Sequence, residues 1–278
     1  MLKKIWLVSL SFICSWACTP AQKLVAEADS SSQAAALTIK GNISLLTADH
    51  LGNMYALRNN DELIKLSARG DSLGVYNQQK NFGSPSSIDV SNPMNILLFY
   101  KSFGTIVLLD RFLSIQSIID LRKNNNWQIS AAAMAYNNGI WLFDEIENRV
   151  LKINKNGDLL STTPDFRNAI GEALQVTEMA DNNRNLYLVD TLRGMYIFDY
   201  FGNLQRKMEL PDWQNLHFNF PYLSGNNADT LFHLQVNTEK ITSYKVPHAY
   251  VGDKAFSITP LLWGYRKKEG VEIRRMEK

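Results

Sequence analysis

The chain has 278 residues, 45% of them hydrophobic, with 29 lysines and arginines against 27 aspartates and glutamates. One domain of this size buries about three-quarters of its unfolded surface, so it can fold without covalent cross-links. The near balance of charge excludes a general electrostatic attraction to nucleic acid.

The first seventeen residues have the layout of a secretory leader. Lys3 and Lys4 precede an apolar stretch, Ile5–Ile13, that is too short to span a bilayer permanently. The "SWAC" segment that ends at Cys18 resembles the processing box of bacterial lipoproteins, which implies cleavage before Cys18 and its acylation. An ordinary cleaved signal peptide, or an uncleaved anchor, is the alternative.

Removal of this leader changes both the charge and the cysteine content. Lys3 and Lys4 are its only charged residues, so the mature chain is neutral overall. Both cysteines, Cys14 and Cys18, lie in or at the end of the leader. The folded part is therefore expected to contain neither a disulfide nor a thiolate metal site, and packing alone must stabilise it.

Residues 18–34 form a polar segment, "TPAQKLVAEADSSSQA" after the cysteine, without periodicity. We expect a flexible tether whose ends lie roughly 20–25 Å apart. Several lipoprotein families of the Bacteroidetes mark surface export with an acidic cluster soon after the lipidated cysteine, and none is present here. This favours a cell-envelope protein anchored in the outer membrane on its periplasmic side.

An internal repeat of about 44 residues dominates the rest of the chain. It is clearest in "NGIWLFDEIENRVLKINKNGDLL" and "NLYLVDTLRGMYIFDYFGNLQ". Residues that close a short apolar strand recur at Ser67, Asp110, Asn154, Asp199 and Lys245. A second register, in the strand before, passes through Tyr55, Leu98, Trp141, Tyr187 and Phe232.

The short runs within each repeat, such as "NMYAL" and "RVLKI", are β-branched, aromatic or alternating, which predicts strands. Gly70, Gly157 and Gly202 stand three places after the first register, where a hairpin loop needs a left-handed residue. Leu113 takes that place in the second repeat, so we expect its turn to be built differently.

Four short strands per repeat are typical of a β-propeller blade. Full repeats begin near Ile43, Ser86, Ile129, Leu174 and Asn219, and three strand-like pieces follow. The early "ALTIKG" can supply the missing fourth strand and close the ring, which removes two open sheet edges. The sequence predicts an all-β, six-bladed propeller over residues 35–278, with five blades plus a capping tail as the alternative. A helix is expected over 166–180.

In one class of propeller a small residue or Gly-Asn leads into an aromatic strand, and a charged residue closes the next strand. In this the chain resembles six-bladed propellers of the NHL and YncE-like type over nearly the whole mature domain. The resemblance implies the fold and leaves the function open, because propellers serve unrelated enzymes, sugar binders and scaffolds.

Loops between the second and third strands gather with the inter-blade loops on one face of a propeller. Three places past the second register stand Arg58, Lys101, Asp144, Asp190 and Gln235, a ring of mixed sign. The carboxylates of Asp144 and Asp190 suit a hard cation or an acid–base pair. Propeller lactonases, which the fold resembles, hold a metal with such carboxylates. The alternative is that both residues merely end strands and begin turns.

The inter-blade loops add aromatic and amide side chains, which a sugar or peptide platform needs and which blade packing uses equally well. The candidates are Phe82, Trp127, Trp213, His217 and Phe218.

No nucleophile elbow, P-loop or dinucleotide fingerprint occurs, and no two of the four histidines are spaced i, i+4. We therefore expect a noncatalytic, lipid-anchored scaffold for protein–protein interaction or envelope assembly. The alternative is an envelope enzyme, or a glycan- or metal-binding protein, that uses the channel face. No cofactor is expected apart from a divalent cation in that alternative, and nucleic acid is not an expected partner.

Overall fold

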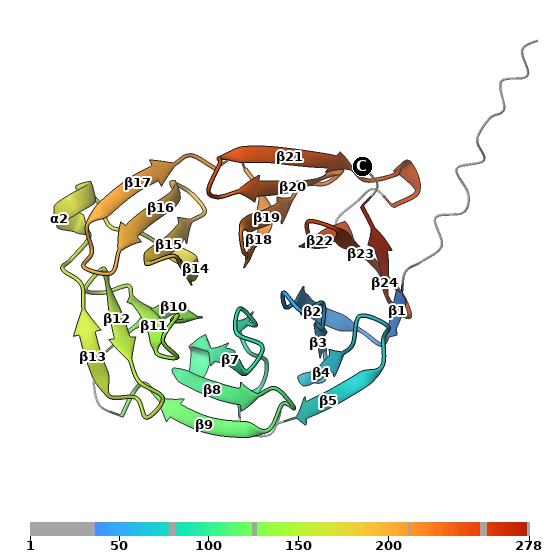
Figure 1. The fold of residues 1–278 in the computed structure, drawn as a ribbon, viewed down its shortest axis with the longest axis horizontal. Helices are drawn as coiled ribbons and strands as arrows, with labels where there is room; N and C mark the ends of the chain where they lie inside the picture. The colour runs from blue at the N-terminus through green and yellow to red at the C-terminus, as the bar shows by residue number, and fades with distance from the viewer. Residues whose placement is uncertain (1–36, 78–81, 124–126, 211, 251–254, 277–278) are drawn as a thin grey trace, which may run out of the picture. The chain divides into compact units, whose positions relative to one another are not determined.

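The computed structural model describes residues 37–77, 82–123, 127–210, 212–250 and 255–276. These residues form six antiparallel sheets of four strands each, which follow one another in a ring (Figure 1). The predicted six-bladed β-propeller is thereby confirmed, and the five-bladed alternative is excluded.

Five blades are meanders of consecutive strands that run from the channel to the rim. Blade one contains β2 (Ile43–Ala48), β3 (Met54–Arg58), β4 (Glu62–Leu66) and β5 (Ser72–Asn77). Blade two contains β6 (Ser87–Asp89), β7 (Asn95–Tyr100), β8 (Thr105–Asp110) and β9 (Ile115–Asp120), with the 3₁₀ turn η1 (Lys101–Phe103). Blade three contains β10 (Ile129–Met134), β11 (Ile140–Asp144), β12 (Arg149–Ile153) and β13 (Leu159–Thr162).

Blade four contains β14 (Val176–Asn182), β15 (Asn185–Asp190), β16 (Gly194–Asp199) and β17 (Leu204–Met208). Blade five contains β18 (Gln214–Asn219), β19 (Tyr222–Asn226), β20 (Thr230–Gln235) and β21 (Lys240–Lys245). A 3₁₀ turn, η2 (His248–Tyr250), follows β21. No helix in the described parts of the chain is long and apolar enough to cross a membrane.

Blade six joins the two ends of the domain. It contains β22 (Ala255–Thr259), β23 (Leu262–Lys267), β24 (Gly270–Arg275) and, as its outermost strand, β1 (Leu37–Lys40). β1 pairs antiparallel with β24, with Leu37 opposite Ile273 and Lys40 opposite Gly270. The predicted closure of the ring by an N-terminal strand is therefore confirmed.

The meander gives the ring two distinct faces. We call the face with the loops between first and second strands and between third and fourth strands the hairpin face. The face with the loops between second and third strands and between successive blades is the crossover face. Because every blade has the same strand order, each loop can be assigned to a face from the topology.

The turns between third and fourth strands share one hydrogen-bond pattern in blades one to four, which explains the first register there. In blade two the Asp110 carboxylate accepts the backbone N–H groups of Phe112 and Ser114, both at 2.8 Å. Ser67, Asn154 and Asp199 make the same pair of contacts in their own turns. Each turn thus satisfies its own backbone donors through a side chain.

The expectation of a different turn at Leu113 was wrong. Leu113 adopts a left-handed conformation with φ of 65°, as Gly70, Gly157 and Gly202 do with φ of 92°, 91° and 87°. Its N–H donates to the Asp110 carbonyl, as that of Gly70 donates to Ser67. Leucine replaces glycine here because its side chain is buried in the core between blades one and two.

Two further predictions need correction. The fifth repeat was placed one strand too late, since its first strand is Gln214–Asn219 and Phe232 and Lys245 lie in the third and fourth strands. The expected helix over 166–180 shrinks to α2 (Arg167–Ile170) between blades three and four. From Val176 onward the segment is strand, because Val176 and Met179 pack into the core between these blades.

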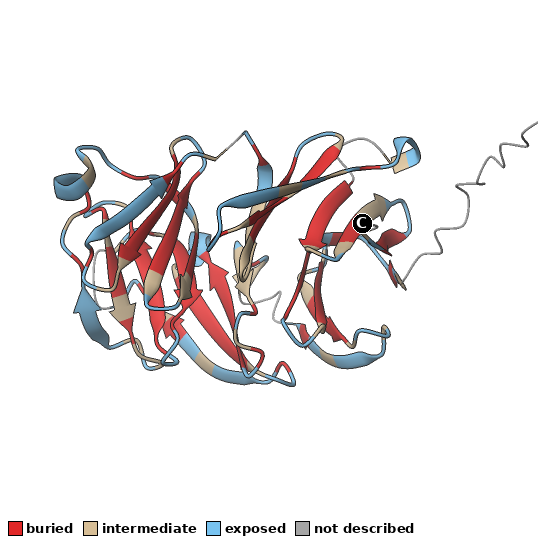
Figure 2. Cartoon of the chain, turned by 45° about the horizontal axis from the view of Figure 1, so that its top comes forward, coloured by how far each residue is buried: buried red, intermediate tan, exposed pale blue. Residues whose placement is uncertain are grey.

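The core consists of clusters between neighbouring blades. Between blades three and four it contains Trp141, Phe143, Phe166 and Phe198, and the rings of Phe166 and Phe198 stack at 4.0 Å. Figure 2 shows the inner strands buried and the rim strands exposed, as in β13. The described segments contain no cysteine, and packing between blades stabilises them.

Candidate functional site

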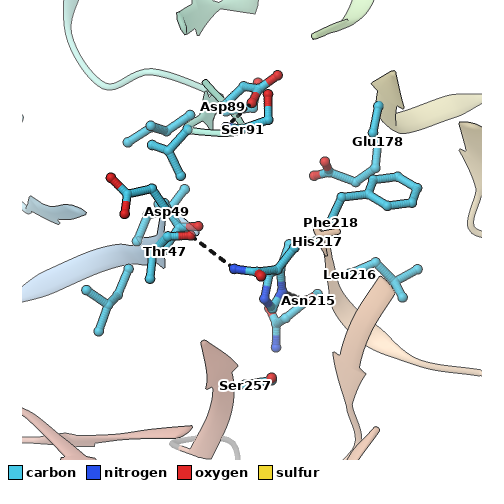
Figure 3. A pocket seen from close by; sticks show the side chains of 18 of the residues that line it. Thr47, Asp49, Asp89, Ser91, Glu178, Asn215, Leu216, His217, Phe218 and Ser257 are labelled. Carbon is cyan, nitrogen blue, oxygen red and sulfur yellow. Dashed lines mark hydrogen bonds between the residues drawn. The ribbon is translucent and has the colours of Figure 1, made fainter. Parts of the chain in front are cut away.

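A cavity of about 330 Å³ lies along the central channel. Its walls come from the innermost strands β2, β6, β10, β14, β18 and β22. Polar side chains from five of the blades face it, among them Thr47, Asp89, Glu178, His217 and Ser257 (Figure 3). This volume is at the lower end of the range for pockets that hold small ligands.

β-Bulges in the innermost strands decide which side chains face the channel. The pairing of β14 with β15 skips Thr177, so that Val176 lies opposite Asp190 and Glu178 opposite Val189. The Thr177 hydroxyl donates to the Val189 carbonyl at 3.3 Å and holds this irregular point in place. A bulge re-aims the side chain that follows it, and here that side chain is Glu178.

Ser44 in blade one and Ser130 in blade three stand at the corresponding irregularities of β2 and β10. The Ser44 hydroxyl donates to the Leu57 carbonyl at 3.1 Å, and that of Ser130 to the Val176 carbonyl of the next blade at 2.9 Å. The bulge therefore recurs in blades one, three and four. Of these three blades, only blade four has an acidic residue after the bulge.

Glu178 is the most perturbed carboxyl group of the channel. It is half-buried, and within the described segments its carboxyl group has no hydrogen-bond or ion-pair partner. Burial raises its pKa from 4.5 to about 8, and the negative charge of Asp89 adds to this increase. At neutral pH the carboxyl group is thus largely protonated and can donate a hydrogen bond into the cavity.

Asp89 of blade two is held in place by backbone donors. One carboxylate oxygen accepts the Ser91 N–H at 2.8 Å, and the other accepts the Met134 N–H of blade three at 2.7 Å. Between Asp89 and Glu178 the channel wall is formed by Ala132, whose small side chain leaves the space between the two carboxyl groups open.

His217 connects blade five with the adjacent blade six, and Asn219 connects it with blade one across the channel. The His217 Nδ1 atom lies 3.2 Å from the Asn215 carbonyl oxygen, and Nε2 lies 3.3 Å from that of Ile258 in blade six. A neutral imidazole carries one N–H and donates to one of them, and burial lowers the pKa of His217. The Asn219 amide donates to the Ala48 carbonyl of blade one at 3.0 Å.

Arg266 brings a positive charge to the crossover end of the cavity. Its guanidinium donates to the Ser44 carbonyl at 3.2 Å and lies 4.4 Å from the centre of the Phe256 ring. Burial lowers its pKa. The cavity is therefore basic near Arg266 and acidic near Asp89 and Glu178.

Asp144 and Asp190 stand at the ends of β11 and β15 on adjacent blades, as the sequence placed them, but neither lines this cavity. Asp190 is fully buried and accepts the N–H groups of Gln175 at 2.8 Å and Leu192 at 3.0 Å, and Arg193 Nη1 at 3.0 Å. Asp144 is buried as well and accepts the N–H of Ile146 at 3.3 Å.

Within the described segments, no group of three or more histidine, cysteine, aspartate or glutamate side chains is placed to hold a metal ion. The geometry of Asp144 and Asp190 agrees with the alternative given for them, strand ends that begin turns.

The other members of the predicted ring are engaged in loop contacts. Arg58 pairs with Glu62, and Lys101 lies 3.7 Å from Glu145, both on the crossover face. Gln235 ends the third strand of blade five and so lies on the hairpin face. The residue of blade five that corresponds to Asp190 is Asn226, whose side-chain oxygen accepts the Asn215 amide at 3.0 Å.

The predicted aromatic residues contribute mainly to packing. Trp213 is buried and stacks on Phe232 at 5.0 Å. Phe82 and Phe218 are half-buried against the cores of their blades. Trp127 is half-buried between blades two and three, beside a smaller hollow of about 160 Å³. Of the ten ring and loop residues named from the sequence as candidates for a ligand site, two line the central cavity, His217 and Phe218.

Sequence reasoning did not find Asp89, Glu178 and Arg266. The residues that follow the bulge in blades one and three are Leu45 and Ala131, so Glu178 is a charged residue at an apolar position of the repeat. That mismatch within the innermost strand was the available signal.

No protein-family model matches the chain, and no curated protein sequence matches it. Several solved structures are similar in fold. A streptogramin B lyase has a TM-score of 0.54 and 12% identity, over 87% of this chain and 88% of that chain.

A catalytically inactive virginiamycin B lyase from Staphylococcus aureus, crystallised with quinupristin, has a TM-score of 0.50 and 14% identity, over 87% of this chain and 83% of that chain. The WD40 domain of Neurospora crassa Pan2 has a TM-score of 0.52 and 9% identity, over 86% and 80%. At these identities the likeness shows the propeller fold and nothing of the activity.

Proposed function

We propose that this chain is a noncatalytic binding protein of the cell envelope whose propeller holds a ligand in its central channel. The observation that carries the proposal is the cavity of about 330 Å³ into which the carboxyl group of Glu178 projects without a partner in the described segments. Burying such a group costs free energy unless a ligand or water satisfies it.

The ligand class follows from the charges of the cavity. Asp89 supplies a fixed negative charge, and Glu178 adds a second one when a cation displaces its proton. Thr47 and Ser257 add hydroxyl groups to the wall. The fitting ligand is therefore a small molecule, or a protruding segment of a partner protein, with a basic amine and hydrogen-bonding groups.

The envelope location is supported by the leader and by Cys18. An acyl chain contributes about 0.8 kcal/mol per buried methylene, and a single chain anchors only reversibly, so firm attachment requires more than one chain on Cys18. Radiolabelled fatty acid should label the wild-type chain and fail to label a Cys18→Ala variant. Equal labelling of both, or labelling of neither, would refute the anchor.

Blocking the channel tests the binding role. Ala132→Leu places a larger side chain in the cavity, and Val75→Leu is a control that introduces leucine on the exposed rim of blade one. Tagged full-length protein is cross-linked in the native host and purified, and the bound proteins and small molecules are identified by mass spectrometry. A species that co-purifies with the wild type and the Val75→Leu variant, but not with Ala132→Leu, supports channel binding. Identical recovery from all three contradicts it.

A second candidate is an enzyme that uses Glu178 and Asp89 as an acid–base pair. The observation that favours it is the pKa of about 8 for Glu178 in the same cavity as the Asp89 carboxyl group, an arrangement suited to proton transfer near neutral pH. A lyase is among the fold neighbours. Incubation with quinupristin, the ligand of one neighbour, provides a first assay. Consumption of quinupristin by the wild type but not by the Glu178→Gln variant would support this candidate. If the wild type leaves quinupristin unchanged, lyase activity of that type is excluded.

A further inference from the structure

The two faces of the propeller expose different kinds of side chain. At the hairpin face, loop tips of five blades carry a large apolar side chain that is mostly exposed, from 52% for Met94 to 90% for Tyr136. The full set is Leu51, Met94, Phe112, Tyr136, Phe201 and Leu261. Each stands alone at the tip of its own turn, so the face has a ring of separate apolar points.

The crossover face is dominated by ion pairs. They include Arg58–Glu62, Lys101–Glu145, Arg122–Asp120, Arg167–Asp165, Arg193–Glu172, Lys245–Asp229 and Lys267–Glu272. Its exposed apolar residues, Phe103, Ile146 and Leu192, lie in the loops among these charged pairs. A surface with this many charged groups is suited to contact with solvent water.

The hairpin face has fewer ion pairs in the described segments, and Arg206–Glu239, at the turn between the third and fourth strands of blade five, is one of them. The carboxylates of Asp110 and Asp199 accept backbone N–H groups of their own turns. Arg69, Arg111 and Arg184 are exposed at turn tips and have no ion-pair partner in the described segments. Cationic groups beside exposed apolar side chains match the headgroup region of a bilayer that contains anionic lipid.

The chain leaves the propeller on this same face. Leu37 begins β1 and pairs with Ile273, near the end of β24 that points to the hairpin face. A Cβ atom on Gly70, in the hairpin-face turn of blade one, would lie 2.5 Å from Leu37 Cδ1, so the two are in contact. The residues between Cys18 and Leu37 span at most about 65 Å when fully extended, so a lipid on Cys18 can hold this face against a bilayer.

We propose that the hairpin face is the membrane-facing side of the protein, with its apolar loop tips inserted into the interface of a bilayer that contains anionic lipid. The orientation rests on the proposed acylation of Cys18, whereas the affinity of the loop tips does not. A protein partner would require a contiguous, packed apolar centre, which these separated tips do not form. A lipid interface accepts single aromatic and aliphatic side chains at one level.

Vesicle binding of the unlipidated chain tests the affinity of the face by itself. Strands β1 to β24 lie within residues 37–276, so a chain that begins at residue 19 keeps the whole ring. Vesicles of phosphatidylethanolamine with phosphatidylglycerol are floated with wild type, with Leu51→Ser/Tyr136→Ser/Phe201→Ser, and with the crossover-face control Phe103→Ser/Ile146→Ser/Leu192→Ser. We expect the hairpin-face variant to bind roughly tenfold more weakly and the control to bind as wild type does.

Site-directed labelling shows which face enters the lipid. Residues 19–278 contain no cysteine, so Phe201→Cys and Leu192→Cys, both 79% exposed before substitution, can each carry one environment-sensitive dye. Vesicles should shift the emission of the dye at position 201 to the blue and leave that at 192 unchanged.

Equal vesicle binding by the two triple variants, or a shift at 192 alone, would overturn the proposal. Cross-linking of position 201 to an envelope protein without any vesicle shift would also overturn it and assign the face to a protein partner. The chain used in these experiments has no acyl group, and its channel residues are unchanged. Neither result therefore bears on ligand binding in the channel, and fatty-acid labelling tests the lipid anchor separately.

Discussion

Glu178 and Asp89 face the same channel from blades four and two, and burial together with the charge of Asp89 holds the pKa of Glu178 at about 8. The strand between them contributes Ala132, which leaves their carboxyl groups accessible to a ligand. An apolar residue in place of Glu178 would make the fold more stable. We therefore infer that the Glu178 carboxyl group serves ligand binding and not stability.

The first prediction concerns the pH dependence of stability. The folded-state pKa of Glu178, about 8, lies above its ordinary value of 4.5. Between these values the folded protein binds more protons than the unfolded chain, so this contribution is fully present below pH 4.5 and is lost as the pH rises through 8. Glu178→Gln should therefore raise the free energy of unfolding at pH 9, by on the order of 1–3 kcal/mol, and change it little at pH 4.

Urea unfolding of both proteins at pH 4, 7 and 9 measures this difference. The exposed Glu209 provides the control, since Glu209→Gln removes a carboxyl group that solvent already surrounds. A gain in stability for Glu178→Gln that is the same at every pH would contradict the assigned pKa.

The second prediction separates a structural from a ligand-binding role for Asp190. Asp190→Ala removes the acceptor of the Gln175 and Leu192 N–H groups and one of the two carboxylate partners of Arg193. We expect the free energy of unfolding to fall by about 2–4 kcal/mol. Asp158→Ala, at an exposed turn where the carboxylate accepts the Asn154 amide, should change it by less than about 0.5 kcal/mol. Unchanged stability of Asp190→Ala, with loss of divalent-cation binding, would restore the carboxylate pair as a site.

The fold was predictable because the repeat is recorded in strand length, aromatic spacing and turn residues. The register failed in blade five, where the turn between third and fourth strands has Glu239 at a φ of 57° in place of a glycine. Without that glycine, "TLFHLQ" was aligned with the aromatic second strand of the other blades. His233, in this strand, was correctly interpreted as structural, because its Nδ1 lies 2.8 Å from the Ser224 hydroxyl.

The site was less predictable, because β-bulges decide which side chains face the channel, and a single sequence does not reveal these bulges. In a regular strand Thr177 and Met179 would share a face opposite to Glu178. The extra residue at Thr177 shifts this alternation by one place and decides which side chains after it face the channel. The search for charges in the crossover loops therefore found turn-forming residues such as Asp144.

The third prediction concerns the left-handed leucine in the turn of blade two. A left-handed conformation costs a residue with a side chain roughly 1–2 kcal/mol, and Leu113→Gly removes this strain. The same change removes a buried side chain from the core between blades one and two, at a cost of about 2–5 kcal/mol. We expect a net loss of about 1–3 kcal/mol in thermal or urea unfolding. Phe112→Ala, next to it and exposed, should be nearly neutral, and a stabilising Leu113→Gly would show that strain outweighs packing.

The last prediction concerns the closure of the ring. A Cβ atom on Gly270 would lie 2.0 Å from the Ile39 carbonyl oxygen, so Gly270→Ala must displace β1 from β24. Ile39 would leave its buried contacts with Ile43 and Phe256, and the edge of β24 would become free to pair with another chain. We expect the free energy of unfolding to fall by at least about 3 kcal/mol, with faster proteolysis before residue 43 and aggregation on warming.

Gly52→Ala is the matched control, because φ is 84° there but the nearest atom to an added Cβ is the Ala68 Cβ at 3.7 Å. It should cost about 1 kcal/mol from backbone strain alone. Equal losses for the two variants, with no change in proteolysis near the N-terminus, would mean that β1 contributes little to holding the ring closed.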